Sequence, residues 1–451
     1  MNQQTLRQIA EQMVAQALEA GADSAEVLAV TERELTTKVR LGEPELVQQA
    51  GSRALGLRVL RDQRQAVCYT SDLSEAALPI FVKETARLAS LAEPDPDAGP
   101  PDPEQLATAW DDLDLHDEAV AALQADQALS MAREAEQAAR DADPRITNSE
   151  GATCSVSEGG RVLATSGGFV GGYRGTYVSL VVEPVADDEG GKKRNGFWWD
   201  GRRHLARLQP PAAIGLEAAS RTLAQLGARK IETCQIPVIF SPEAGAQVLR
   251  TLFSLVSGDA AWRRSTVLLG REGSDIASAR VTVVDDPLIP GAPGSRPFDG
   301  EGLPARRNVV VDAGRFTGFL CDTYAGRRLG VPSTASAGRG VGGPPGVSAS
   351  NFFLAPGDPS AEALERSTAR GLYVTRMMGF GFNPVTGDFS KGAEGFLIED
   401  GQRTAPVSEI TVSAHFEDLL KGVDAVADDL DLRSGVASPT FRVSRMTVAG
   451  S

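Results

Sequence analysis

The chain has 451 residues, enough for two or three domains whose hydrophobic cores need no crosslinks. Its formal net charge of −15 repels polyanions, which argues against nucleic-acid binding because phosphate contacts supply most of that affinity. Four cysteines without a CxxC pair, and no apolar run near the ~18 residues of a membrane span, predict a cytoplasmic protein without a membrane partner.

Residues 1–92 are predicted to form an α+β lobe. Apolar residues at i, i+3 and i+4 spacing predict an amphipathic helix over residues 4–20. Alternating and β-branched residues predict strands within 25–43 and 54–70. A second helix is predicted within 71–92, capped by a serine or an aspartate.

Residues 93–104 are predicted to be an acidic, proline-rich linker, because five prolines and five acids in twelve positions bury little apolar surface. A second α+β lobe is predicted over 105–229. It begins with one long alanine-rich helix over 117–143, continues with strands and ends with a helix near Gly227.

Residues 230–451 are predicted to form a β-rich domain. Short strand-like runs separated by glycine and proline indicate a partly closed sheet, with helices on one side at 242–255, 360–371 and 416–429. The predicted fold class is therefore α+β. Two N-terminal lobes, with helices on small antiparallel sheets, precede a β-rich C-terminal domain with a few helices.

The run Gly371–Gly401 is the candidate site, because its seven glycines interrupt strand-like residues at irregular intervals. Glycine there permits a positive φ or the close approach of another backbone, and the second use suits an extended peptide. The candidate peptide-binding residues, polar side chains and glycines together, are Asn383, Thr386, Gly387, Asp388, Ser390 and Gly392. The alternative is that they only make the turns of a hairpin. They include no strong base, nucleophile or metal ligand, so no catalytic residue and no metal site is predicted.

A GxGxxG match at 338–343 is not interpreted as a dinucleotide site, because Pro344 follows where a helix would have to start. The long loop Gly326–Ser350 that contains it is either functional or disordered. The basic cluster Gly190–His204 carries three aromatic residues, as a stacking platform for single-stranded nucleic acid would. The acids just before it favour a β-hairpin whose side chains pack on a neighbour.

Five segments carry a family resemblance, in the same order along the chain. They are Asn148–Gly168, Ser350–Ser360, Gly371–Gly401, Pro406–Leu432 and Phe441–Ser451. Together they resemble the TldD/PmbA family, proteins linked to metal-dependent peptide cleavage and once called modulators of DNA gyrase.

The resemblance implies two branches that differ in chemistry. In the TldD branch, a helical HExxxH motif supplies two histidine ligands for a metal and a glutamate base. The corresponding segment here is Ser241–Gly270, in which Arg250, Thr251 and Leu255 stand in place of the motif. The chain therefore resembles the PmbA/TldE branch, which implies no cofactor in this chain and zinc in a TldD-like partner.

The resemblance thus implies a non-catalytic subunit of a cytosolic TldD-type metallopeptidase complex. Its partner would be a TldD-like subunit or a second copy of the chain, and its substrates extended or unfolded peptides and peptide precursors. Two alternatives stay open. One is a stand-alone metal-dependent peptidase that uses His204 or His415 with carboxylates. The other is a homodimeric binding protein that acts on gyrase.

Overall fold

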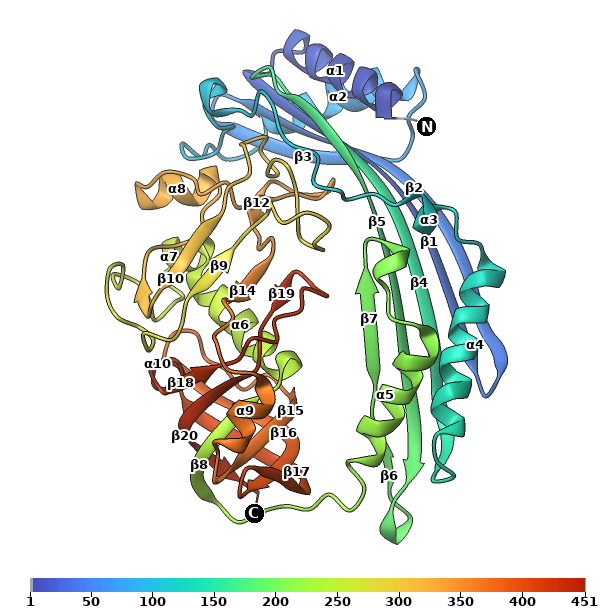
Figure 1. The fold of residues 1–451 in the computed structure, drawn as a ribbon. Helices are drawn as coiled ribbons and strands as arrows, with labels where there is room; N and C mark the ends of the chain where they lie inside the picture. The colour runs from blue at the N-terminus through green and yellow to red at the C-terminus, as the bar shows by residue number, and fades with distance from the viewer. Residues whose placement is uncertain (1–2, 451) are drawn as a thin grey trace.

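One antiparallel sheet of seven strands runs through the N-terminal half of the chain in the computed structural model, which describes residues 3–450 (Figure 1). The strand order is β3-β2-β1-β4-β5-β6, and β7 also pairs with β5. The strands are β1 (Ser24–Arg40), β2 (Glu43–Arg61), β3 (Arg64–Thr70), β4 (Ile146–Thr165), β5 (Val170–Asp187), β6 (Lys193–Asn195) and β7 (Trp198–Arg202). The α+β class is confirmed. The strands expected in two small sheets form one large sheet, because β1 pairs with β4 along most of its length.

Helices cover one face of this sheet in two separate groups (Figure 1). They are α1 (Gln3–Glu19), α2 (Ala77–Ala89), α3 (Glu118–Ala121), α4 (Ala125–Asp141) and α5 (Pro211–Leu223). The first two helices enclose an apolar core with Val27 and Leu57, and the other three enclose a second core with Leu180 and Ile214. No helix within residues 3–450 is both long enough and apolar enough to span a membrane.

The C-terminal domain is built on a partly closed sheet, as predicted. The strand order is β17-β16-β15-β8-β20-β18, and a further pairing of β17 with β20 closes five strands into a barrel. The strands are β8 (Cys234–Phe240), β15 (Arg370–Met378), β16 (Asp388–Glu399), β17 (Gln402–His415), β18 (Val423–Val426) and β20 (Phe441–Ala449).

A second C-terminal sheet has the order β11-β10-β9-β14-β19. It consists of β9 (Val283–Asp285), β10 (Asn308–Asp312), β11 (Arg315–Phe316), β14 (Phe352–Leu354) and β19 (Val436–Ala437), and a small ribbon is formed by β12 (Ala337–Gly338) and β13 (Gly346–Val347). The helices of the domain are α6 (Pro242–Val256), α7 (Gly258–Trp262), α8 (Thr323–Leu329), α9 (Ala361–Arg366) and α10 (Phe416–Lys421). The largest hydrophobic core of the chain lies between the two sheets and α6.

Several helix predictions were wrong in extent. The single helix expected over 117–143 is divided, because Gln124 begins α4 with a capping box that it forms with Gln127. The helices expected over 360–371 and 416–429 end early, since the residues that follow them pair into β15 and β18. α2 begins without the expected serine or aspartate cap.

The acidic, proline-rich segment 93–104 lies against α8 of the C-terminal domain. Arg328 pairs with Asp97 at 2.9 Å, and Arg327 donates to the carbonyl oxygen of Pro100 at 2.6 Å. These bonds fix an extended segment whose composition offers little apolar surface. The segment therefore ties the N-terminal sheet to the C-terminal domain through its polar groups.

A buried ion triad makes the other main junction between the two halves. Glu26 of β1 is completely buried and accepts hydrogen bonds from Arg58 of β2 and from Arg339, which is 313 residues away in sequence. Burial raises the pKa of Glu26, but the two guanidinium groups outweigh this effect and hold the pKa below its ordinary value. Nearby, Val341 packs so closely on the sheet that a Cβ at Gly56 would lie 2.2 Å from its carbonyl oxygen. The glycine-rich loop is thus ordered by its contact with β1 and β2.

Three buried carboxyl groups lie on the C-terminal side of this junction. Asp299 accepts from the backbone N–H of Leu303 and of Ala337, and Glu301 accepts from the backbone and the hydroxyl group of Thr323. Burial, together with the charge of Asp299, raises the pKa of Glu301 to about 8. Burial also raises the pKa of Asp322 to about 6. The junction therefore contains carboxyl groups whose pKa burial raises, as well as Glu26, whose pKa the two arginines lower.

We expect Glu26→Gln to lower the free energy of unfolding by about 3–5 kcal/mol, because the substitution leaves two buried guanidinium groups without an anion. The measurement is the shift of the denaturant midpoint. The matched control is Glu45→Gln, which removes an exposed partner of Lys38 and should shift the midpoint far less, because solvent screens the pair. Equal shifts for the two variants would contradict the role given to the triad.

A second prediction concerns pH. The folded chain keeps a proton on Glu301 up to about pH 8, whereas the unfolded chain loses it near 4.5, so this group makes the wild type less stable as pH rises between these values. Glu301→Gln should flatten that decline in a series of melting temperatures from pH 5 to pH 8. Glu104→Gln, at an exposed position, should leave the decline unchanged. Parallel curves for wild type and Glu301→Gln would refute the assignment.

Candidate functional site

The predicted peptide-binding residues lie at the turn between β15 and β16 and along the first part of β16. Asn383 accepts hydrogen bonds from the N–H groups of Val385 and Thr386 at 3.0 and 3.3 Å, and the Thr386 hydroxyl donates to Asp388 at 2.6 Å. These are the bonds of a self-contained turn, which the alternative interpretation describes. The side chains of Asn383, Thr386, Asp388 and Ser390 are nevertheless exposed to solvent. A peptide-binding role for these residues stays a prediction.

The two candidate glycines have close neighbours within the chain. Gly387 has a φ of +78°, and a Cβ there would lie 2.6 Å from Nε2 of His415, which donates to the Thr386 carbonyl oxygen at 3.0 Å. A Cβ at Gly392 would lie 2.9 Å from Cγ of Met378. In addition, β16 pairs with β15 on one edge and β17 on the other, so it offers no free edge for a strand-like peptide. Contact with a peptide would therefore have to come from exposed side chains.

Helix α6 carries the three positions at which the resemblance places a metal motif. Arg250 is exposed, the hydroxyl of Thr251 donates back to the carbonyl oxygen of Gln247 at 3.1 Å, and Leu255 is 1% exposed in the core. A guanidinium group has no lone pair for a metal, an alkyl group has no donor atom, and a threonine hydroxyl is a poor base. The helix is built, but its donor set does not fit zinc.

Two of the three histidines, His116 and His204, lie near Asp117, whereas His415 lies in the C-terminal domain. Nε2 of His204 lies 3.0 Å from Asp114, and Nε2 of His116 lies 3.4 Å from Glu158. His415 packs against the turn of the β15–β16 hairpin. Throughout residues 3–450, no three histidine, cysteine, aspartate or glutamate side chains are grouped so that they could hold a metal ion.

The basic cluster Gly190–His204 forms the outer arm of a hairpin with β5, with which both β6 and β7 pair, and it packs on its neighbours. Trp198 is buried between the guanidinium groups of Arg221 and Arg433, which lie 3.8 and 4.4 Å from its ring centroids. Arg202 makes a two-bond ion pair with Asp431, at 2.7 and 2.9 Å. These side chains thus take part in the contact between the N-terminal sheet and the C-terminal domain.

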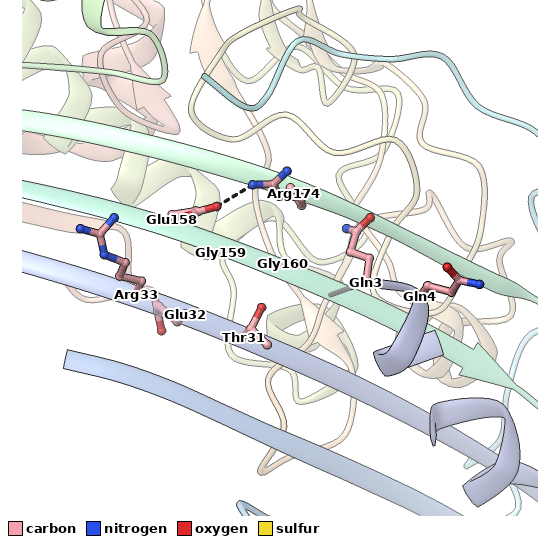
Figure 2. A pocket seen from close by; sticks show the side chains of 9 residues that line it. All are labelled: Gln3, Gln4, Thr31, Glu32, Arg33, Glu158, Gly159, Gly160 and Arg174. Carbon is pink, nitrogen blue, oxygen red and sulfur yellow. Dashed lines mark hydrogen bonds and ion pairs between the residues drawn. The ribbon is translucent and has the colours of Figure 1, made fainter. Parts of the chain in front are cut away.

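A cavity of about 740 Å³ lies on the helix-covered face of the long sheet, between the two helix groups (Figure 2). Figure 2 shows Glu158 of β4 turned toward Arg174 of β5, with which it pairs at 2.7 Å. The other cation of the lining, Arg33, donates to two carbonyl oxygens beside α3. Because these charged groups are already partnered, the cavity makes a weak case for a ligand.

A second cavity, of about 490 Å³, lies on the opposite face of the same sheet. Its lining comes from β1, β4 and β5, from the loop at 293–296 and from the loop at 339–341. The sequence analysis missed the residues of this cavity, because they come from segments far apart in the chain and no single segment carries a motif. The only available signal was Arg339 within the GxGxxG match.

Three family models match consecutive parts of the chain. They describe the PmbA/TldA metallopeptidase domain 1 over residues 25–90, the central domain over 118–226 and the C-terminal domain over 233–450. The first two models fall on the long N-terminal sheet and its helices, and the third falls on the C-terminal domain.

Individual relatives match over nearly the whole length. Metalloprotease PmbA of Escherichia coli O157:H7 is 34% identical over 447 residues, which cover 98% of this chain and 97% of that protein. A crystal structure of a proposed modulator of DNA gyrase from Bacteroides thetaiotaomicron is 27% identical, covers 100% of both chains and has a TM-score of 0.93. TldE of Thermococcus kodakarensis, at 23% identity, shares the fold with a TM-score of 0.88 over 98% of this chain and 100% of that one. This chain belongs to the PmbA/TldD metallopeptidase family and is PmbA-like along almost its entire sequence.

Proposed function

We propose that this chain is the non-catalytic, PmbA/TldE-like subunit of a TldD-type metallopeptidase complex that cleaves unfolded peptides or peptide precursors. Its partner is a TldD-like subunit that supplies zinc, the histidine ligands and the glutamate base. Family membership supports the link to peptide cleavage, and the chemistry of this chain's own side chains supports the division of labour. The gyrase-modulator description belongs to the Bacteroides relative.

The observation that carries the proposal is helix α6. The helix has its N-terminal cap, with Ser241 accepting from the N–H of Ala244 at 3.3 Å, and its apolar face is buried in the largest core. Arg250, Thr251 and Leu255 nevertheless offer no ligand pair and no base. A complete helix without metal-ligand side chains is consistent with a subunit that helps to form the substrate channel of the complex but does not bind the metal.

The role of the β15–β16 turn follows from the same proposal. Because β16 has no free edge, its exposed polar side chains, Asp388 and Ser390 among them, would line the path of the peptide rather than extend the sheet. Cleavage itself would take place at the partner's metal.

The test is reconstitution of peptide cleavage. This chain alone should not cleave an unstructured fluorogenic peptide, and cleavage should appear when a TldD-like subunit with an intact HExxxH motif is added. Replacing the glutamate of the partner's motif by glutamine should abolish cleavage by the complex while the two subunits still co-purify, because the general base is lost and the interface is not.

The competing interpretation, a stand-alone metallopeptidase, gives the opposite result in the same assay. A stand-alone metallopeptidase would show chelator-sensitive cleavage by this chain alone, and elemental analysis would find about one tightly bound metal per chain. Loss of that metal in His204→Gln or His415→Gln would then locate the ligand, and the proposal for a non-catalytic subunit would be abandoned.

A further inference from the structure

The second cavity, between the long sheet and the C-terminal loops, has a floor made largely of glycine. Gly159 and Gly160 of β4 line it and put no side chain over the sheet backbone, whereas Gly175 of β5, which also lines it, is covered by Arg203, whose Nη1 would lie 2.7 Å from a Cβ there. A volume of about 490 Å³ is within the range of about 300–1,000 Å³ that holds small ligands and short peptide segments. An uncovered backbone lets the main chain of a bound segment come close.

Arginine side chains border this cavity without carboxylate partners. Arg161 makes one recorded contact, in which its guanidinium carbon lies 5.6 Å from the ring centroid of Tyr173. Arg296 donates to the hydroxyl and the carbonyl oxygen of Ser348, and its Nε is buried without any partner. Arg203 donates only to backbone carbonyl oxygens. No ion pair within residues 3–450 involves any of these three arginines.

The acids near the cavity form no ion pair with these arginines. Glu32 is the acid on the lining, and it is exposed and forms no ion pair. Asp285 and Asp299 feel the charge of Arg296, but they are buried, and burial raises the pKa of each. In a chain whose net charge is −15, the lining of this cavity thus holds four arginines and one acid. Arg339, the fourth arginine on its edge, is already bound to Glu26.

A planar, two-oxygen anion is the ligand that this arrangement lacks. A buried donor without an acceptor destabilises the folded chain, and a carboxylate matches the donor geometry of guanidinium in two parallel bonds. The aromatic rings of Tyr173 and Tyr177 line the same space and offer surface to neighbouring side chains of a ligand.

We propose that this cavity binds the carboxylate group of a peptide, with Arg161 and Arg296 as its donors. The choice of a peptide as the carrier rests on the proposed function. The carboxylate requirement rests on the arginines alone. The group comes either from the C-terminus of the peptide or from an acidic side chain, and these two sources differ in a binding experiment.

The experiment measures fluorescence anisotropy with the full-length chain and no partner subunit. Four peptides of one neutral sequence, labelled at the N-terminus, are compared: the free acid, the C-terminal amide, the amide with one internal glutamate and the amide with glutamine in its place. The free acid, the glutamate amide or both should bind at least tenfold more tightly than the two uncharged amides. Binding of the free acid alone identifies the C-terminus, and equal binding of the glutamate amide identifies the side chain.

Two variants test the location. Arg161→Gln should weaken binding by about tenfold, as expected for the loss of one charge-assisted hydrogen bond. Gly340→Leu should block the cavity, because Gly340 lines it and a Cβ there meets nothing within 4 Å, so the new side chain enters the open space without straining the fold. Arg370→Gln, an exposed arginine at the start of β15, is the matched control and should bind as the wild type does.

The proposal is overturned if the uncharged amides bind as tightly as the acids, or if none of the peptides binds. It is also overturned if Gly340→Leu and Arg161→Gln both keep wild-type affinity with an unchanged melting temperature. Since no cleavage is measured, these outcomes leave the proposed subunit role untouched. Conversely, failure of the reconstituted complex to cleave peptides would not alter the carboxylate binding measured here.

Discussion

The placement of the C-terminal domain against the long sheet depends on one buried carboxylate. Glu26 lies between Arg58, its neighbour on the sheet, and Arg339, which arrives from the glycine-rich loop. Burial of three charges is costly, and a well-packed apolar triad of similar volume could be as stable. The ion triad also fixes the position of the loop relative to the sheet, because a guanidinium group pairs with a carboxylate in only a few orientations. Next to the triad, the backbone of Val341 packs closely against Gly56, and this contact further fixes the position of the loop.

The fixed position of the loop bears on the proposed carboxylate-binding cavity, and the packing of α6 bears on the proposed role as a non-catalytic subunit. The loops at 339–341 and 293–296 form one wall of the arginine-lined cavity, while β1, β4 and β5 form the opposite wall. The position of the first wall relative to the second is set by the triad. Helix α6, by contrast, is fixed by apolar packing in the largest core and by polar contacts such as that of Glu243 with Arg433 at 3.0 Å. Scaffold and chemistry are thus separable in this fold.

The sequence predicted those features that depend on local pattern. The helix near the N-terminus and the helix from Pro242 follow from local pattern, and the structure has them. The union of two lobes into one sheet could not be read from either lobe, because it depends on β1 pairing with a strand more than a hundred residues away. The same limit hid the triad and the arginine cavity, whose members share no segment. The end of α10 was misjudged because 423–426 reads as helix until its pairing with β20 is known.

The pairing of β1 with both β2 and β4 has a consequence for the order in which the chain can fold. β1, β2 and β3 are consecutive, so this meander and its Glu26–Arg58 pair can form early, with short loops to close. The other edge of β1 stays unpaired until β4, which ends at Thr165, has been synthesised. Arg339 can reach Glu26 only after most of the chain has been synthesised. Such high contact order slows folding and leaves a long strand edge unpaired in the meantime. During synthesis, β1 is therefore the segment of this protein most in need of protection from aggregation.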